Sequence, residues 1–496
     1  MVRWTPGPRA LSQVLQEQNP WYAHASVPIS LAPKTQRPFA QLLWRRLLQN
    51  HPRRFQLVLG PRRVGNTTVL YQTVRALLEQ GIPVERIWWL RMDHPLLIQA
   101  DLGDLVRAVL SSSDATSDRP VFLMLDELVY AKSWDLWLKT FYDEQWPVRI
   151  AATSSATAAL RERRHESGVG RWEDQYLMPF TFGELLDLIG EPQPVDLGAT
   201  LAETLQRLPM GQPPRVELQK KRQMFMLVGG FPELLTPLSP DQETWQETDT
   251  WELMLRSQQV LRRDAIERTV YKDIPQSFGV NDPMDLERLL YVLAGQMTGV
   301  LSPSSISSNL GIAQPTFDRY LSYLDRAFLV FTLTNYAGSE AKIQRRGRKL
   351  YFVDSAVRNA ALQRGIAPLS DPAELGLLLE NLVATSIRTL AAQTMVRLHY
   401  WRSGSLEVDL IYEDPRQPLA FEIGSSARHS QKGLRALIRR FPRFRGNSYL
   451  ITPQAAVIHA EETESGVGTL PLDTFLLAIS AQAKQALAAR LGVFNV

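Results

Sequence analysis

The first half of the chain alternates short apolar runs with stretches of helical periodicity. Four short, mostly apolar runs are candidates for strands, and they are Phe55–Leu59, Ile87–Leu90, Val121–Leu125 and Val148–Thr153. The run Val121–Leu125 is continuously apolar, which is typical of a strand buried on both faces. Helical patterns occupy Thr67–Gln80 and Trp134–Asp143. Strands and helices in this alternation predict an α/β fold, built on a parallel sheet with helices on both faces.

The pattern changes near residue 191. Segments rich in Pro and Gly at Glu191–Val195 and Leu208–Val216 indicate a linker or a lid boundary. From Gln223 to about Ala327 the chain is mostly helical, and Glu374–Thr452 returns to a helix followed by strands. We therefore expect further domains after the α/β core.

Composition narrows the class of protein. The 496 residues are enough for about three or four domains. Hydrophobic residues make up 45% and charged residues 21%, which is ordinary for a soluble globular protein. The net charge of +4 permits contact with nucleic acid without requiring it. Cysteine is absent, which excludes disulfides, thiolate zinc sites and cysteine nucleophiles. Without a secretory signal or a long apolar run, we expect a cytoplasmic protein with no membrane segment.

The loop after the first strand has the pattern of a phosphate-binding P-loop. It joins a strand to a helix, the context in which backbone N–H groups at a helix N-terminus bind phosphates. Both glycines and the threonine stand in the expected places, but asparagine replaces the lysine of the pattern. The residues expected to bind ATP or ADP are Gly60, Pro61, Arg62, Arg63, Val64, Gly65, Asn66, Thr67 and Thr68.

Two acidic residues end the third apolar run, as in a Walker B motif. We expect Asp126 and Thr67 to hold Mg²⁺, and Glu127 to polarise the attacking water. The fourth run ends in hydroxyl side chains, of which Ser154 is expected near the terminal phosphate. Three elements in this order, each on the expected secondary structure, argue against a chance match.

Asn66 removes the ammonium group that bridges the β- and γ-phosphates. Loss of one preorganised donor lowers rates by about 10²- to 10³-fold in other enzymes, and loss of a charge should cost at least as much. Arg62 and Arg63 are expected to point away from the place of that lysine. We predict nucleotide binding with weak or absent hydrolysis; enzymatic activity stays open, as does whether the substitution is natural or engineered.

These motifs give the chain a resemblance to AAA-family ATPases of bacteria and archaea that carry the C-terminal domain of unknown function 4143. Gly60–Thr67 is similar to their GPRRVGKT-type loop except at Asn66, and Thr153–Ala156 is similar to their TGSSA-type segment. Further matches are Gly170-Arg171, Leu177–Glu184, Gly229–Glu233 and Arg268–Ile274. Because such cores often take an arginine from a neighbouring subunit, the resemblance implies a homo-oligomer with Arg171 as the candidate; Arg161, Arg163 and Arg164 are its rivals.

The resemblance also implies the order of the domains. We expect an N-terminal extension (1–50), an AAA+-like P-loop core (51–190) and a linker with a small helical lid (191–250). A winged-helix domain (251–355), a restriction-endonuclease-like α/β domain (356–460) and a helical tail (461–496) complete the chain.

Ser304–Leu310, the turn Gly311–Ala313 and Gln314–Ala327 have the pattern of a helix-turn-helix. A basic hairpin, Lys342–Lys349, follows it. The alternatives for this region are DNA contact and packing against other domains or subunits. The candidates for contact with nucleic acid are Thr316, Arg319, Tyr323, Arg326, Arg345, Arg346 and Arg348.

The terminal domain has the layout of a PD-(D/E)xK nuclease without its lysine. Glu380, Asp409 and Glu422 match the carboxylates that hold magnesium in such enzymes, but Gly424 stands in the place of the lysine. Lys432 and His429 are the nearest replacements in sequence. We expect a vestigial nuclease fold that binds nucleic acid or protein, with a basic cluster at Arg439, Arg440, Arg443 and Arg445.

Three hypotheses follow. The first is an oligomeric ATP- and Mg²⁺-binding protein with weakened hydrolysis. The second is a nucleic-acid-binding protein in which the nucleotide acts as a switch. The third is an active nuclease gated by nucleotide, and the absence of both lysines counts most against it.

Overall fold

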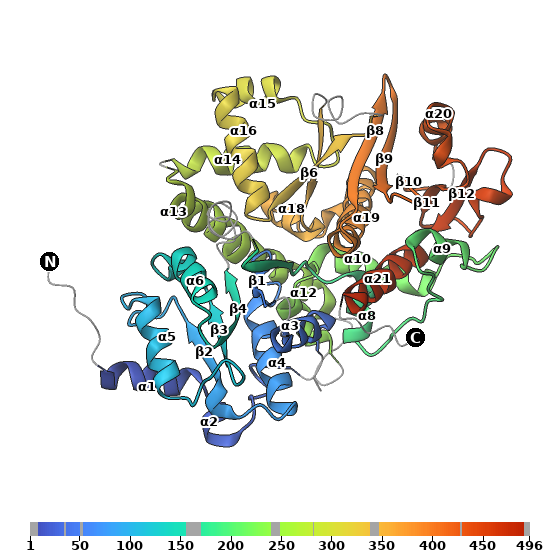
Figure 1. Cartoon of the computed structure of the whole chain (residues 1–496). Coiled ribbons are helices and arrows are strands. Elements are labelled where there is room, and N and C mark those ends of the chain that lie inside the picture. The colour runs from blue at the N-terminus through green and yellow to red at the C-terminus, as the bar shows by residue number, and fades with distance from the viewer. Residues whose placement is uncertain are drawn as a thin grey trace. The chain divides into compact units, whose positions relative to one another are not determined.

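The structure is a computed structural model that describes residues 8–33, 36–49, 53–154, 170–239, 249–280, 282–337, 347–426 and 429–490. The chain forms two compact units. Unit 1 comprises 1–178, 273–279 and 487–496, and unit 2 comprises 179–272 and 280–486. Each unit has its own sheet (Figure 1).

Unit 1 contains the predicted parallel sheet. Its strands are β1 (Phe55–Leu59), β2 (Ile87–Arg91), β3 (Val121–Asp126), β4 (Val148–Ser154) and β5 (Trp172–Tyr176). They pair in parallel in the order β2-β3-β4-β1-β5. The four predicted strands are confirmed, and their central positions are fully buried because helices cover both faces. The pattern missed β5, an edge strand whose sequence WEDQY has no continuous apolar run.

The helices of unit 1 flank this sheet. They are α1 (Pro8–Gln18), α2 (Trp21–His24), α3 (Pro38–Leu48), α4 (Asn66–Glu79), α5 (Leu102–Ser111), α6 (Trp134–Asp143) and α13 (Ile274–Phe278). Figure 1 shows α5 and α6 on one side of the sheet and α3 and α4 on the other. The segment predicted as an extension is tied to the core, because Asn19 accepts a hydrogen bond of 2.6 Å from the Trp89 N–H and the Trp21 indole donates to the Ile87 carbonyl.

Unit 2 begins with short helices and continues into a helical region. These elements are α8 (Phe182–Leu188), α9 (Leu201–Gln206), α10 (Gln219–Val228), α11 (Pro232–Leu235), α12 (Asp249–Val260), α14 (Pro283–Gly295), α15 (Pro303–Leu310), α16 (Gln314–Arg326), α18 (Ser355–Ala361) and α19 (Pro372–Thr394). Two π-helical turns, Leu261–Glu267 and Thr269–Asp273, continue α12 toward α13. Phe317, Leu321 and Leu324 line the buried face of α16, as their spacing predicted.

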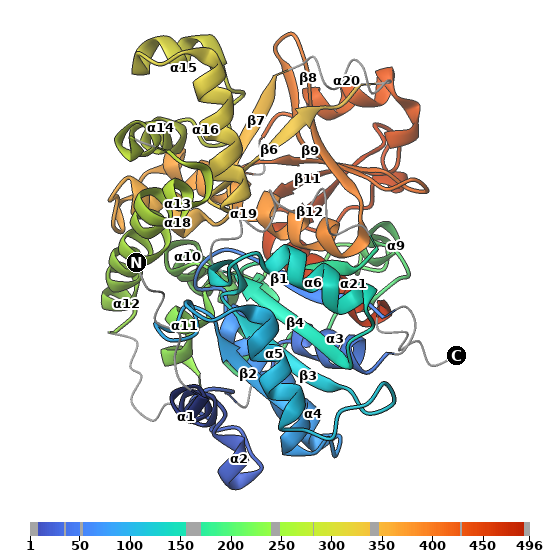
Figure 2. The same cartoon turned by 60° about the vertical axis from the view of Figure 1, so that its left-hand side comes forward.

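The sheet of unit 2 has seven strands. They are β6 (Val330–Asn335), β7 (Arg348–Phe352), β8 (Arg397–Ser403), β9 (Leu406–Glu413), β10 (Leu419–Ile423), β11 (Ser448–Thr452) and β12 (Val467–Pro471), in the order β12-β11-β10-β9-β8-β6-β7. The antiparallel pair β6 and β7 follows α16 and joins the nuclease-like strands through β8 (Figure 2). The helix-turn-helix region and the terminal domain therefore share one continuous sheet.

Two expectations about the C-terminal half need correction. The tail predicted from residue 461 contains β12, a strand of the sheet, before α21 (Leu472–Ala489) begins. Also, α19 passes a length and hydropathy test for a membrane span, although no apolar run of that length was expected. It is 56% buried over the tested window, as the core helix of a globular domain would be.

Candidate functional site

The P-loop has a backbone that only its glycines allow. Gly65 lies directly before α4 with a φ of 91°, in the left-handed region that side chains rarely adopt. A Cβ on Gly60 would collide with the carbonyl oxygen of Leu177, whose own N–H donates to Leu59. Arg63 also has a positive φ, 68°, so the loop holds a non-glycine residue in a strained conformation.

Three strand ends bring the predicted magnesium ligands together. The Thr67 hydroxyl lies 3.1 and 3.2 Å from the two carboxylate oxygens of Asp126. The Thr153 hydroxyl, at the end of β4, lies 2.5 Å from Asp126 Oδ1. Two neighbouring ligands of octahedral Mg²⁺, each about 2.1 Å from the ion, are about 3.0 Å apart. The Thr67 and Asp126 oxygens therefore have the separation that a shared Mg²⁺ requires.

Asp126 is the most perturbed acid of this site. Its side chain is buried at the end of β3, and burial raises the pKa of its carboxyl to about 7, although the Thr153 and Thr67 hydroxyls oppose the shift. Glu127 follows with a left-handed φ of 57°, which turns the chain at the edge where β1 and β4 also end. Ser154 is fully buried beside Leu59. A buried carboxyl of this kind gains most from a cation, since the cation favours its charged form.

Asn66 does not replace the ammonium of a lysine. Its amide nitrogen donates to the Pro61 carbonyl at 3.3 Å, so the side chain turns back onto its own loop. Its amide oxygen is buried and has no hydrogen-bond partner among the described residues. The side chain thus stabilises the loop weakly and places no positive charge at the phosphate site.

Arg62 is held by a partner that the motifs did not indicate. Its guanidinium makes a bidentate ion pair with Asp273 at 2.5 and 2.6 Å, and both side chains are nearly buried. Asp273 lies in the segment Arg268–Ile274. The resemblance of this segment to the AAA-family ATPases did not indicate a role for Asp273. Glu127 also acts on the Arg62 guanidinium, so the pairing with Asp273 does not test whether Arg62 points away from the place of the lysine.

Arg171 lies at the amino-terminal ends of the strands, whereas the P-loop follows the carboxyl-terminal end of β1. It directly precedes β5, and its carbonyl accepts a hydrogen bond from the Phe55 N–H at the start of β1. Its guanidinium pairs with Asp143 at 2.7 and 3.0 Å and is partly exposed. Within one subunit it cannot reach a nucleotide at the other end of β1. The rivals Arg161, Arg163 and Arg164 fall outside the described residues.

The helix-turn-helix candidates differ in exposure. Arg319 is exposed on α16, whereas Thr316, Tyr323 and Arg326 are half-buried. Arg348 is exposed at the start of β7, and Arg345 and Arg346 lie outside the described residues. The structure therefore leaves an open basic position on the second helix and one on the adjoining strand.

The terminal domain has a lysine that the sequence pattern did not reveal. Lys349 extends from β7 into the cluster of carboxylates and is 1% exposed. Its ammonium lies 2.8 Å from Glu380, 2.7 Å from Glu407 and 2.7 Å from Asp409. Lys349, the last residue of the basic hairpin predicted at Lys342–Lys349, is therefore buried in the domain, and residues 342–346 of that segment lie outside the described residues. A lysine on one strand and carboxylates on another cannot be matched by spacing alone.

His429 and Lys432, the residues suggested as replacements for the lysine missing at Gly424, have different surroundings. The His429 ring lies 3.2 Å from Glu422, and this contact raises the pKa of the imidazole. Lys432 is exposed and has no acidic partner among the described residues. A Cβ on Gly424 would stand 2.5 Å from the Cβ of His429, so glycine is what lets the histidine approach Glu422.

The carboxylate cluster does not fit an open metal site. Within the described ranges, no group of three or more His, Asp or Glu side chains has the arrangement to hold a metal ion. Instead, the ammonium of Lys349 occupies the space between Glu380 and Asp409. Burial and the nearby Asp409 carboxylate raise the pKa of Glu380 to about 7 and that of Glu422 to about 8, which favours the protonated, neutral form of both side chains near neutral pH.

A five-stranded parallel sheet of this order, with a P-loop after β1 and acidic residues after β3, defines an AAA-type P-loop core. Comparison with protein families agrees: the AAA domain matches residues 52–186, a domain of unknown function (DUF8612) matches 219–367, and a second (DUF4143) matches 375–474. The chain therefore contains an AAA-type P-loop domain and, C-terminal to it, a DUF4143 domain.

Similar proteins span most of the chain. The uncharacterized protein MJ1637 of Methanocaldococcus jannaschii is 23% identical over 79% of this chain and 80% of its own length. An uncharacterized protein of Haemophilus influenzae is 22% identical over 62% of this chain and 69% of its own.

Two solved structures share part of the architecture. The Aeropyrum pernix ORC1 protein in complex with DNA is 14% identical with a TM-score of 0.30, over 70% of this chain and 97% of its own. Cdc6p from Pyrobaculum aerophilum is 14% identical with a TM-score of 0.28, over 69% and 98%. Scores this low do not define a common fold over the whole chain.

Proposed function

We propose that the chain binds ATP or ADP with Mg²⁺ at the P-loop and hydrolyses ATP weakly or not at all. The observation that carries this proposal is the pairing of Thr67 with Asp126 at 3.1 Å, at the start of a helix that follows the glycine loop of a P-loop pattern. Asn66 explains the weak hydrolysis, since it supplies no charge where phosphoryl transfer needs one.

Titration calorimetry with ATP and ADP, with and without Mg²⁺, tests the proposal. We expect binding that Mg²⁺ strengthens. Thr67→Val removes the hydroxyl ligand and should lower the Mg²⁺-dependent gain by about tenfold or more, as loss of a charge-assisted contact does. Thr73→Val on the same helix is the matched control, because that buried hydroxyl only donates to the Val69 carbonyl. Wild-type protein that fails to bind nucleotide at millimolar concentration would contradict the proposal.

We also infer that the protein assembles into a homo-oligomer in which Arg171 faces the nucleotide of a neighbouring subunit. The inference is supported by the position of Arg171 at the amino edge of the sheet, where only another subunit could use it for catalysis. Light scattering after gel filtration, with and without Mg-ATP, tests the assembly. A strictly monomeric protein under both conditions would refute it.

A second candidate function is binding of nucleic acid by unit 2. The exposed Arg319 and Arg348 on the helix-turn-helix and the adjoining strand support it. Activity as a nuclease is the function that the geometry supports least, because Lys349 fills the carboxylate cluster. Incubating plasmid with Mg²⁺ or Mn²⁺ tests this alternative, and intact DNA would remove it.

A further inference from the structure

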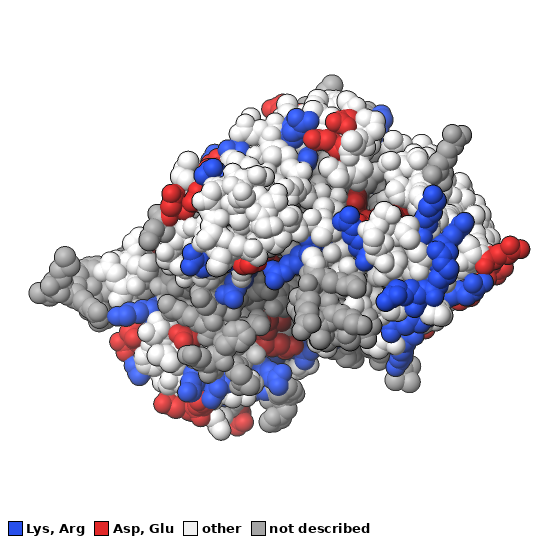
Figure 3. Space-filling model, turned by 90° about the horizontal axis from the view of Figure 1, so that it is seen from above, with Lys and Arg blue, Asp and Glu red and all other residues white. Residues whose placement is uncertain are grey.

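One surface of unit 2 carries only positive charge. It is formed by α20 (Lys432–Arg440) and the 3₁₀ turn Pro442–Phe444 that follows it. Every exposed position of α20 is basic, and the turn and its end add two more arginines. We call this surface the α20 ridge, and its residues are Lys432, Arg435, Arg439, Arg440, Arg443 and Arg445. Figure 3 shows basic side chains gathered at the right of the view, where this region lies.

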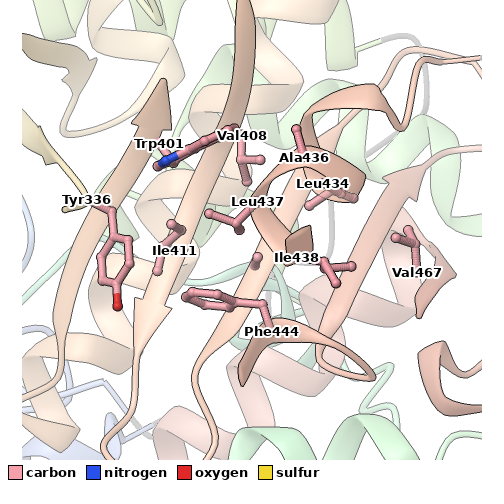
Figure 4. Packing of buried hydrophobic residues seen from close by; sticks show 11 residues of the cluster. Tyr336, Trp401, Val408, Ile411, Leu434, Ala436, Leu437, Ile438, Phe444 and Val467 are labelled. Atoms are coloured by element: carbon pink, nitrogen blue, oxygen red, sulfur yellow. The ribbon is translucent and has the colours of Figure 1, made fainter. Parts of the chain in front are cut away.

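The opposite face of α20 is anchored in the domain core. Leu434 and Leu437 pack with Val408 and Ile411 of β9, and Phe444 closes the same cluster (Figure 4). Gly433 lets the helix rest on the backbone of Glu407, since a Cβ there would collide with that carbonyl oxygen. The ridge is therefore presented by a rigid helix, and its apolar residues are not available to a partner.

Stability does not explain the charges. No Asp or Glu occurs between Glu422 and Glu461. Among the described residues, Arg443 is the one ridge residue with an acidic partner, Glu413 at 3.7 Å, and Arg397 and His399 share that partner. Pairs such as Arg435 and Arg439 are one helical turn apart, and like charges at this spacing destabilise a helix by about 0.2–0.5 kcal/mol. Contacts within the domain stabilise part of the ridge, since Arg440 and Arg443 lie over aromatic rings and Arg445 donates to the Glu464 carbonyl. The charges of Lys432, Arg435 and Arg439 have no acidic partner among the described residues, and an anion would relieve their repulsion.

We propose that the α20 ridge binds the phosphate backbone of duplex nucleic acid, which rests on and deepens the second candidate function above. Five of its six side chains are arginine, whose planar guanidinium binds phosphate through two parallel hydrogen bonds. Nine helical residues extend over roughly 13 Å, which equals the rise along the duplex axis of about four phosphates of one strand. The ridge is therefore long enough to contact several phosphates.

Other anionic partners fit this surface less well. A helix that binds a membrane surface inserts an apolar face, whereas the apolar face of α20 is buried in the domain. A protein interface relies on aromatic or apolar anchors, and the exposed positions of the ridge offer none. Repeated phosphates require neither.

Two contacts connect α20 and the segment before it to the carboxylate cluster. His429 lies three residues before α20 and contacts Glu422, while Gly433 of α20 rests on Glu407. A backbone bound along the ridge would reach the edge of the carboxylate cluster that Lys349 closes. The domain would thus still bind nucleic acid where a nuclease binds its substrate, although its metal site is not open.

Fluorescence anisotropy with a labelled 30-base-pair duplex (about three helical turns), over a series of KCl concentrations, tests the proposal. The variant is Arg435→Gln/Arg439→Gln/Arg440→Gln, which relieves like-charge repulsion and should fold. Arg207→Gln/Arg256→Gln/Arg288→Gln removes the same charge from exposed positions of unit 2 and is the matched control. Circular dichroism melting verifies that both variants are folded.

We expect the ridge variant to lose about tenfold or more in affinity and to lower the slope of log Kd against log salt by about two to three, since each phosphate contact contributes about 0.9. The control should bind like wild type. Duplex binding that is equal in all three proteins would overturn the ridge but leave the second candidate function in place. Absence of binding by wild type overturns both. The proposal would also be overturned if the ridge variant bound duplex like wild type but lost binding to polyglutamate or to phosphatidylserine vesicles.

Discussion

Restoring the lysine of the P-loop should convert a binding site into an ATPase. In Asn66→Lys, the side chain gives up one weak hydrogen bond of 3.3 Å to Pro61 and a buried amide oxygen without a partner. The new ammonium can reach the phosphates from the first position of α4, where the helix N-terminus also favours them. Thr67, Asp126 and Glu127 stand in place, so we expect kcat to rise by about 10²- to 10³-fold or more.

A coupled assay of phosphate release measures this gain at saturating Mg-ATP. Asn66→Gln is the control, because it lengthens the side chain without a charge and should leave turnover low. Asn66→Lys/Glu127→Gln should lose the gain, since Glu127 is the candidate for polarising water. If Asn66→Lys binds ATP and still does not hydrolyse it, the reasoning fails, and the degeneration of the site extends beyond the missing charge.

Further predictions concern single ion pairs and one titrating acid. Asp273→Ala leaves Arg62 unpaired and nearly buried, so urea denaturation should show a loss of about 3–5 kcal/mol. Asp143→Ala at the more exposed Arg171 pair should cost much less, and equal losses would contradict this account. Lys349→Met leaves several carboxylates without a positive charge and should lower the free energy of unfolding by an amount similar to that of Asp273→Ala. Mn²⁺ should restore part of the thermal stability of this variant and should not raise that of wild type. Burial raises the pKa of Asp354 from 3.8 to about 6, so its protonated form stabilises the fold below about pH 4 and this contribution is lost as the pH rises through 6. The difference in unfolding free energy between wild type and Asp354→Asn should therefore fall by about 3 kcal/mol from pH 4 to pH 7, and a flat difference would refute the assignment.

Much of unit 1 could be predicted from sequence because its strands are buried on both faces. The strand β3 is a continuous apolar run until Asp126, and β1 and β4 are mostly apolar runs with one long polar side chain each, Gln56 and Arg149; the ends of these strands also carry the site residues. The edge strand β5 has no apolar run, whereas α5 was not predicted although its apolar residues have helical spacing. Domain borders were less predictable, since β12 joins its sheet through pairing with β11, a long-range contact that leaves no local signal.

Contacts between residues far apart in the sequence could not be predicted from motifs. Asp273 follows Arg62 by 211 residues, and Lys349 precedes Asp409 by 60. Lys349 also stood among arginines, so its neighbours indicated an exposed hairpin. A buried lysine is costly unless it is paired, and only the fold shows that three carboxylates surround this one.

The two missing lysines therefore differ in kind. At the terminal cluster, Gly424 makes room for His429, and the charge absent there is supplied by Lys349 from another strand. At the P-loop, the nearest candidate for compensation is Arg62, and Asp273 holds it in a bidentate pair. The carboxylate cluster contains the buried positive charge of Lys349, whereas the P-loop has no charge at Asn66 and keeps Thr67 beside Asp126, the pair that we propose binds Mg²⁺. A single substitution can thus restore function only at the P-loop, which is why Asn66→Lys is the more decisive variant.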